Sequence, residues 1–260
     1  MAEAAIQYPV AEPDMLSLRV LARLLDYPSA ELQAAAPELI EIINDERRWE
    51  AALRARLMEW CQRLLEADLL ELQSEYVALF DKGRATSLLL FEHVHGESRD
   101  RGQAMVDLMA EYTAAGFELD ARELPDYLPL FLEYLSTRPL DEIQNWLEDI
   151  HHILGLLGER LYQRESFYHV VMDSLLTLSG RVANRQELAQ VVASEERDDT
   201  PEALDKVWEE EMVKFVDDQG SSCSTGSVAG QRRRELEQTQ TIHLSDQLMT
   251  DVTPRPAGRA

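Results

Sequence analysis

The 260-residue sequence has only two cysteines, Cys61 and Cys223, and no long apolar run. Two cysteines so far apart support neither a disulfide framework nor a metal knuckle. No apolar stretch approaches the roughly 18 residues that a membrane span needs, and residues 1–14 lack the basic and apolar regions of a secretory signal. The sequence therefore predicts a cytoplasmic protein that does not insert into a membrane.

Enzyme signatures are also missing from the chain. It contains no Gly-x-Gly-x-x-Gly motif, no phosphate-binding Gly-Lys-Ser/Thr, no Gly-x-Ser-x-Gly turn and no His-Glu-x-x-His zinc helix. Cys61 follows Trp60 in a helical pattern, which favours a small buried thiol over a reactive nucleophile. These absences predict a protein that is not an enzyme, with no catalytic residues and no cofactor of its own.

Basic residues are scarce relative to acidic ones. The chain has 25 Lys and Arg against 49 Asp and Glu, which gives a net charge of -24. Such a charge repels nucleic acids and anionic lipids, and it attracts basic segments of other proteins. The acidity therefore predicts a basic protein partner, although the same charge is also typical of a protein that is merely kept soluble.

Helical periodicity, in contrast, is abundant over the first four fifths of the chain. Apolar residues recur at steps of three or four, as on one face of a helix. One such stripe begins at Trp49, and the most regular predicts a single helix at the bundle centre, with Ile143, Leu147, Ile150, Leu154, Leu157 and Leu161. Strand signals are nearly absent, and 45% apolar residues suffice for a core. We therefore expect an all-α, single-domain helical bundle.

Helix start and stop signals divide this pattern into elements. Ser29 is a suitable N-cap after Pro28, and residues 81–83 break a helix. Gly116 stands where a helix ends in the left-handed conformation. The sequence from Leu124 to Pro129 holds two prolines, which favour a turn followed by a helix start, or alternatively a hinge beside a binding site.

The last fifth of the sequence differs in composition. It begins with consecutive glutamates and continues through a Ser/Gly-rich stretch, an Arg-rich patch and a Pro-containing end. Such a composition cannot bury enough apolar surface to offset the entropy of ordering. The sequence therefore predicts a helical domain over residues 1–208 and a disordered tail over residues 209–260.

One short segment has side chains that can ligate a metal. Glu92, His93, His95 and Glu97 lie within six residues. On a helix, His93 and His95 would point about 200° apart, so joint ligation needs a loop geometry. We predict no metal site, and a metal-dependent helical hydrolase stays an alternative. Arg99 and Arg101 nearby are expected to pair with carboxylates of the same chain.

Several segments carry a resemblance to a known family. They are Tyr-Val-Ala-Leu-Phe at 76–80, the stretch from Ser87 to Met105, Gly-Phe at 116–117 and Glu-Leu-Pro-Asp-Tyr-Leu-Pro at 123–129. Together they resemble the redox-enzyme maturation chaperones, and among them the NarJ-type nitrate reductase assembly chaperones, also called delta subunits. The likeness covers roughly residues 16–208. The wider family carries Glu-x-Pro-Asp-His where this chain has a tyrosine as the fifth residue.

The resemblance implies an all-helical chaperone without catalytic activity. Its client would be the apo form of the nitrate reductase catalytic subunit, bound through an N-terminal leader-like segment and a second contact. Members of the family keep the client open for insertion of the molybdenum cofactor, delay its docking at the membrane and leave the finished enzyme. A general adaptor for basic amphipathic peptides is the alternative that the charge alone would allow.

The region from residue 75 to residue 136 is the predicted peptide-binding site. Aromatic and leucine residues crowd around helix breaks there, although a buried corner of the core explains any one of them equally well. An apolar floor with acidic groups beside it suits an apolar, basic peptide. The expected floor residues are Tyr76, Phe80, Leu90, Phe91 and Tyr127. The expected acidic residues are Glu92, Glu97, Asp100, Glu123 and Asp126.

Overall fold

The computed structural model of the protein describes most of the chain up to residue 205. The described residues are 13–95, 99–117, 119, 123–181, 184–200, 202, 203 and 205. Within them all regular structure is helical apart from one isolated antiparallel bridge, between Leu89 and Tyr127. The all-α prediction is therefore confirmed for these residues. The predicted domain boundary at 208 and the predicted tail lie outside them.

The described residues form eleven α-helices. In chain order they are α1 (Pro13–Leu24), α2 (Ala30–Asp45), α3 (Ala51–Glu66), α4 (Leu69–Phe80), α5 (Leu90–His95), α6 (Arg99–Ala114), α7 (Leu128–Leu135), α8 (Leu140–Asp149), α9 (His151–Gln163), α10 (His169–Leu178) and α11 (Arg185–Ala193). In the part of the chain that is described, every helix falls short of the length and apolarity that a bilayer crossing requires.

Local side-chain chemistry sets where several helices begin and end. Ser29 Oγ accepts a hydrogen bond from the Leu32 N–H at 3.1 Å, and Asp68 caps α4 by accepting from the Leu70 N–H at 2.9 Å. Gly116 follows α6 with a φ of 74°, a conformation that costs little only for glycine. The start predicted at Ser29 and the stop predicted at Gly116 are confirmed.

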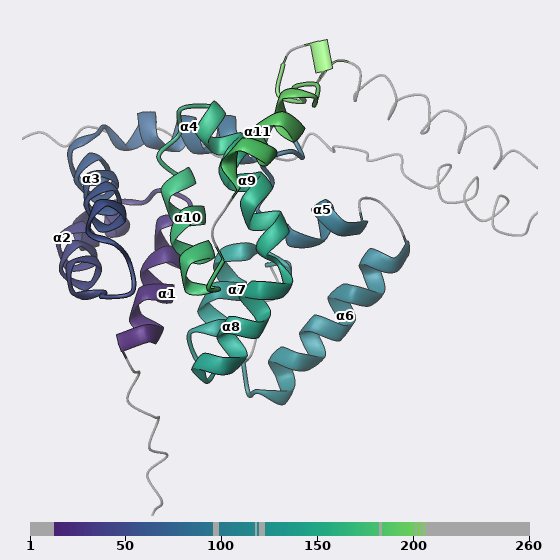
Figure 1. Ribbon diagram of the computed structural model, residues 1–260, viewed down its shortest axis with the longest axis horizontal. Helices are drawn as coiled ribbons and strands as arrows, with labels where there is room; N and C mark the ends of the chain where they lie inside the picture. Colours follow the sequence, from purple (N-terminus) through teal and green to yellow (C-terminus); the bar gives the residue numbers. More distant parts are fainter. Residues whose placement is uncertain are drawn as a thin grey trace, which may run out of the picture. The chain divides into compact units, whose positions relative to one another are not determined.

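A single hydrophobic cluster holds these helices together, and α10 lies at its centre. It packs along α9 and also contacts α1, α3 and α8, an arrangement visible in Figure 1. The approach of α9 to α10 depends on Gly158, because a Cβ there would stand 3.0 Å from Cβ of Met172. Apolar faces from several helices thus share one core.

The prediction of one continuous central helix from residue 143 to residue 161 is wrong. The structure ends α8 at Asp149 and starts α9 at His151, with Ile150 between them at φ -96° and ψ 4°. Leu147 and Leu154 on the two sides of the break are both buried. Apolar spacing cannot detect this break, because a single near-helical residue keeps both faces directed at the same core.

One predicted helix start also lies further along the chain than expected. The stripe starting at Trp49 gives a helix only from Ala51, because Trp49 sits in the preceding turn and donates its Nε1–H to the Ser174 carbonyl at 3.3 Å. The apolar run after Ser87 becomes helical only at Leu90. Leu88 instead pairs with residues after Pro125, because its carbonyl accepts from the Leu128 N–H.

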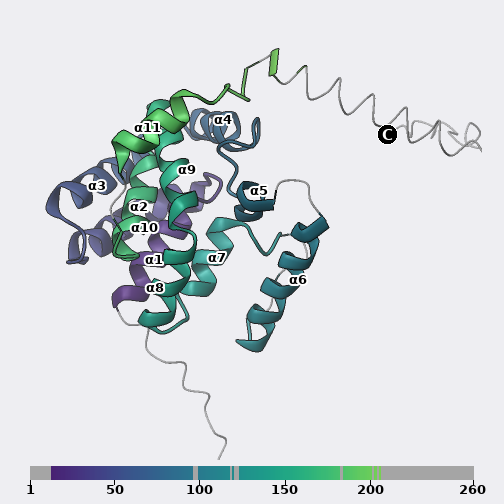
Figure 2. The same ribbon diagram turned by 45° about the vertical axis from the view of Figure 1, so that its right-hand side comes forward.

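Helix α6 has few contacts with the core. In both views it lies at the edge of the bundle, away from α2 and α3 (Figures 1 and 2). Leu108 and Tyr112 are its buried hydrophobic residues, whereas Val106 and Met109 are 59% and 47% exposed. The Tyr112 hydroxyl donates to the Pro125 carbonyl at 2.7 Å. A few anchors therefore hold this long helix and leave an apolar face open.

Candidate functional site

Two short extended segments meet beside α4 and carry most of the predicted site residues. The Leu90 N–H donates to the Asp126 carbonyl at 2.9 Å, and the Leu128 N–H donates to the Leu88 carbonyl at 2.8 Å. These bonds flank the bridge between Leu89 and Tyr127. The start of α5 and the start of α7 are thereby joined, although 38 residues separate Leu90 from Leu128 in sequence.

The Asp126 side chain is hydrogen-bonded to the first turn of α5. Its Oδ2 accepts a hydrogen bond from the Phe91 N–H at 3.0 Å, and its side chain is fully buried. Arg101 of α6 lies 3.9 Å away and pairs with Glu92 at 3.2 Å. This confirms the expectation that Arg101 pairs within the chain, and the side chain of Arg99 lies outside the described residues. One aspartate therefore connects α5, α6 and the segment before α7.

Burial is the largest influence on the charge of Asp126. It raises the pKa of that carboxyl above its ordinary value, while the Phe91 N–H and the Arg101 guanidinium act in the opposite direction. Asp126 Oδ1 and Arg101 Nε are buried without a hydrogen-bond partner among the described residues. The Asp126 and Arg101 side chains are thus close together but incompletely hydrogen-bonded, which makes their burial energetically costly.

The aromatic part of the predicted floor is built on Tyr76 of α4. Its hydroxyl donates to the Leu25 carbonyl at 3.0 Å and lies 3.0 Å from the Tyr127 hydroxyl. Its ring packs against Phe80 at 4.7 Å between centroids. Burial raises the pKa of Tyr127 to about 12 and raises that of Tyr76 as well. Both phenols are therefore neutral hydrogen-bonding groups at neutral pH.

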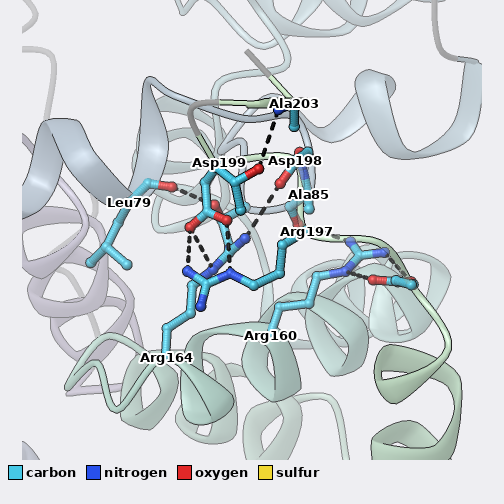
Figure 3. A network of polar contacts seen from close by, with 11 residues as sticks. Leu79, Ala85, Arg160, Arg164, Arg197, Asp198, Asp199 and Ala203 are labelled. Atoms are coloured by element: carbon cyan, nitrogen blue, oxygen red, sulfur yellow. Dashed lines mark hydrogen bonds and ion pairs between the residues drawn. The ribbon is translucent and has the colours of Figure 1, made fainter. Parts of the chain in front are cut away.

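The network shown in Figure 3 fixes the loop that leads into α5. Arg160 donates to the Ala85 carbonyl at 2.9 Å, and the Ala85 N–H donates to Asp198 at 2.6 Å. Arg164 pairs with Asp198 and Asp199, each at 3.4 Å. Residues after α11 thereby hold the loop between α4 and α5 in place.

The predicted site residues differ in whether another molecule can reach them. Buried residues support the floor from within: Tyr76, Phe80, Leu90 and Asp126. Half-buried residues reach the surface in part: Phe91, Glu92 and Tyr127. Asp100 and Glu123 are exposed, and Glu97 lies outside the described residues. Among the predicted site residues that the structure describes, two rings and three carboxylates are therefore accessible.

Exposed apolar residues on the same elements were not predicted from the sequence. Val94, Val106, Met109 and Leu124 are each more than 40% exposed, and they lie on α5, α6 and the segment before Pro125. On α6, Val106 and Met109 lie off the face that carries the buried Leu108 and Tyr112. These apolar side chains are therefore accessible at the surface beside the predicted site.

The candidate metal-ligating segment has a different arrangement. His93 Nε2 lies 2.8 Å from the Ser87 carbonyl, which can only accept, so this nitrogen carries the proton. Burial lowers the pKa of His93. The side chains of His95 and Glu97 lie outside the described residues. Among the residues that are described, no cluster of three or more His, Cys, Asp and Glu side chains is arranged to hold an ion.

Comparison with known proteins identifies the family. The family model described as nitrate reductase delta subunit matches residues 28–169, which is more than half of the chain. The chain belongs to the nitrate reductase delta subunit family. The matched range contains α5, α6, α7 and the buried Asp126, so the family region includes the whole candidate site.

Three members of the family show how far the similarity extends. The nitrate reductase molybdenum cofactor assembly chaperone NarJ of Escherichia coli (strain K12) is 49% identical over 220 residues, which cover 85% of this chain and 92% of that protein. The probable nitrate reductase molybdenum cofactor assembly chaperone NarW of the same strain is 48% identical over 220 residues, which again cover 85% of this chain and 92% of that protein. The probable NarJ of Bacillus subtilis (strain 168) is 27% identical over 68% of this chain and 95% of that protein.

Proposed function

We propose that this chain is the dedicated assembly chaperone of a respiratory nitrate reductase. It works in the cytoplasm, binds the apo catalytic subunit through an N-terminal segment and a second contact, and assists insertion of the molybdenum cofactor. It catalyses no reaction and leaves the finished enzyme. The observation that carries this proposal is the 49% identity to a chaperone of that description over 85% of the chain.

The region around the start of α5 supports a peptide-binding role. Phe91 and Tyr127 expose parts of their rings there, and the carboxylates of Glu92 and Glu123 lie on the same two segments. An apolar, basic peptide would gain contacts with both kinds of group. The net charge of -24 favours encounter with such a peptide and disfavours acidic ones.

The buried residues beneath this region act as its support. Tyr76 and Asp126 hold Tyr127 and α5 through hydrogen bonds of 3.0 Å each. A binding surface keeps its shape when its contact residues are fixed by a buried layer, because less entropy is lost on binding. We therefore assign contact with the client to Phe91 and Tyr127, and support to Tyr76, Phe80, Leu90 and Asp126.

Calorimetric titration of the full chain with the N-terminal peptide of the catalytic subunit tests the proposal. Phe91→Ala should weaken binding by about 30-fold, which corresponds to about 2 kcal/mol for a buried apolar anchor. Tyr162→Ala is the matched control, because Tyr162 is 51% exposed on α9 and outside the region. Its affinity should equal that of the unchanged protein.

A charge variant and a scrambled peptide separate specific binding from charge attraction. Glu123→Gln should weaken binding by a few-fold at low salt and by less at high salt, because exposed charges are screened. The scrambled peptide should lose its affinity at raised salt. Equal binding of both peptides at every salt concentration would favour a general adaptor, and unchanged affinity in Phe91→Ala would reject the assigned site.

A further inference from the structure

Arg101 lies between two carboxylates and is hydrogen-bonded to only one of them. Its Nη1 donates to Glu92 Oε1 at 3.2 Å, whereas its Nη2 is 3.9 Å from Asp126 Oδ2, beyond hydrogen-bonding distance. Arg101 Nε and Asp126 Oδ1 are both buried without a hydrogen-bond partner among the described residues. An unpaired donor and an unpaired acceptor therefore belong to two side chains that are neighbours.

The shapes of these two groups match. Nε and Nη2 form one edge of the planar guanidinium, and the two oxygens of a carboxylate accept from such an edge through two parallel bonds. Bonds of this kind are about 2.7–2.9 Å long, so Arg101 would have to approach Asp126 by about 1 Å. Buried polar groups without partners are costly. The approach would remove that cost for both side chains.

Each of the two side chains is held in its present place from another side. The Phe91 N–H donates to Asp126 Oδ2 at 3.0 Å and fixes this carboxylate against α5. Glu92, the next residue of α5, holds Arg101 through Nη1. One guanidinium is thus shared by two carboxylates, and its position depends on how strongly each attracts it. A cation that neutralises Glu92 therefore releases Arg101 towards Asp126.

The two carboxylates differ in whether another molecule can reach them. The Glu92 side chain is 19% exposed, whereas that of Asp126 is 0% exposed. A cation from outside therefore reaches Glu92 and not Asp126. Arg101 lies in the first turn of α6, and the buried hydrophobic residues among the described side chains of this helix, Leu108 and Tyr112, lie in its second half. The packing of α6 thus permits a small movement of Arg101.

We propose that Arg101 exchanges one carboxylate for the other when a basic peptide binds at the candidate site. A lysine or arginine of the peptide pairs with Glu92, and Arg101 moves to Asp126 and bonds it through Nε and Nη2. The inference rests on the proposed function, because the peptide is the N-terminal segment of the client. Arg101 is a positioning residue that makes recognition depend on a basic residue of the peptide. A neutral peptide leaves Arg101 on Glu92.

Three different roles of Arg101 give different results when it is replaced. Under exchange, binding of the basic peptide gains the new bonds between Arg101 and Asp126, so replacement of Arg101 weakens that binding. If Arg101 only competed with the peptide for Glu92, replacement would strengthen it. If Arg101 only held α5 and α6 together, replacement would change the affinity for basic and neutral peptides alike.

Calorimetric titration of the full chain with two peptides separates these roles. The basic peptide is the N-terminal peptide of the catalytic subunit, and the neutral peptide has each of its lysines and arginines replaced by glutamine. Arg101→Gln should weaken binding of the basic peptide by about tenfold, as expected for hydrogen bonds between charged groups, and leave the neutral peptide unaffected. Arg101→Lys should lose nearly as much, because an ammonium group keeps the charge but lacks the two-atom edge.

Arg138→Gln is the matched control for these variants. Arg138 is also a partly buried arginine paired with a glutamate, since it lies 2.9 Å from Glu142, but it is outside the candidate site. Its replacement should leave the affinity for both peptides unchanged.

A variant of Asp126 tests the other end of the exchange. Asp126→Asn keeps an oxygen that accepts from the Phe91 N–H and removes the charge that attracts Arg101. It should weaken binding of the basic peptide as much as Arg101→Gln does. The double variant should lose no more than either single variant, because all three lack the same bonds. Urea unfolding verifies that the variants fold, and additive losses in the double variant would overturn the exchange.

The exchange also has a direct spectroscopic signature in the unchanged protein. A hydrogen bond moves the proton resonance of an arginine Nε–H downfield, and the Arg101 resonance is the one missing from the spectrum of Arg101→Gln. Saturation with the basic peptide should shift this resonance downfield, and the neutral peptide should not. An unshifted resonance in the complex with the basic peptide would mean that Arg101 stays on Glu92.

The remaining outcomes distinguish this inference from the proposed function. If the basic peptide binds, and Arg101→Gln leaves its affinity unchanged or raises it, the exchange is wrong while the proposed function stands. Equal weakening of both peptides would assign Arg101 to the fold alone and would also reject the exchange. If the unchanged protein does not bind the basic peptide, the proposed function fails and the exchange fails with it.

Discussion

Helices α10 and α6 show how differently two helices of one protein are stabilised. α10 has ten residues and buries seven of them. α6 has sixteen residues, and the buried hydrophobic residues among its described side chains are Leu108 and Tyr112. Tertiary packing supplies most helix stability in proteins. The difference indicates that α10 is part of the central core, whereas α6 is held by few buried side chains.

Shortening one apolar side chain in each helix should give the largest contrast. Leu175→Ala in α10 should lower the free energy of unfolding by about 2–5 kcal/mol, because Leu175 is fully buried and a cavity would remain. Val106→Ala in α6 should change it by less than about 0.5 kcal/mol, because Val106 is 59% exposed. Urea unfolding measures both. A similar loss for the two variants would mean that the apolar face of α6 is covered.

A pair of glycines extends the comparison to the backbone. A Cβ on Gly83 would stand 2.6 Å from Cγ of Asp198, which bonds the Ala85 N–H, so Gly83→Ala should cost about 1–3 kcal/mol. Gly102 in α6 has open space around it, and Gly102→Ala should stabilise by about 0.5–1 kcal/mol through lower backbone entropy of the unfolded chain. Thermal unfolding should show opposite shifts. Equal shifts of the unfolding temperature would contradict the prediction that a Cβ at position 102 of α6 is accommodated without strain.

The smallest effect concerns pH, and it compares two aspartates. Because the pKa of Asp126 is raised in the folded protein, stability should fall as pH rises from the ordinary value of 3.8 through the folded value. The pKa of Asp199 is lowered by its bond from Arg197, so that contribution is present above 3.8 and is lost as pH falls through the folded value.

Denaturant unfolding over a series of acid pH values tests this difference. Asp126→Asn should remove the decline of stability with rising pH, and Asp199→Asn should remove the opposite slope. The same change of slope in both variants would contradict the assigned pKa directions. Asparagine is the suitable replacement because it keeps an oxygen that accepts from the Phe91 N–H or from Arg197 without titrating.

Local patterns predicted the elements of the fold but not all of their limits. Ser29 and Gly116 carry their signals in their own chemistry, and both were confirmed. The break at Ile150 could not be predicted, because the apolar residues before and after it face the same core. The late start of α3 likewise depends on the hydrogen bond of Trp49 to Ser174, which is 125 residues away.

The sequence predicted which segments form the candidate site but not which of their side chains reach the surface. The family resemblance indicated the segments around Phe91 and Tyr127, and the structure joins these segments by hydrogen bonds. Sequence could not tell that Asp126 is buried beneath α5 while Glu123 is exposed, because three residues separate them and both are acidic.

The sequence by itself determined the helical class, the acidic charge and the family, because periodicity, composition and motifs are properties of neighbouring residues. Only the tertiary structure decided which residues of the site reach the surface and which support it. Burial and hydrogen bonding depend on partners that are distant in sequence, and folding alone brings such partners together.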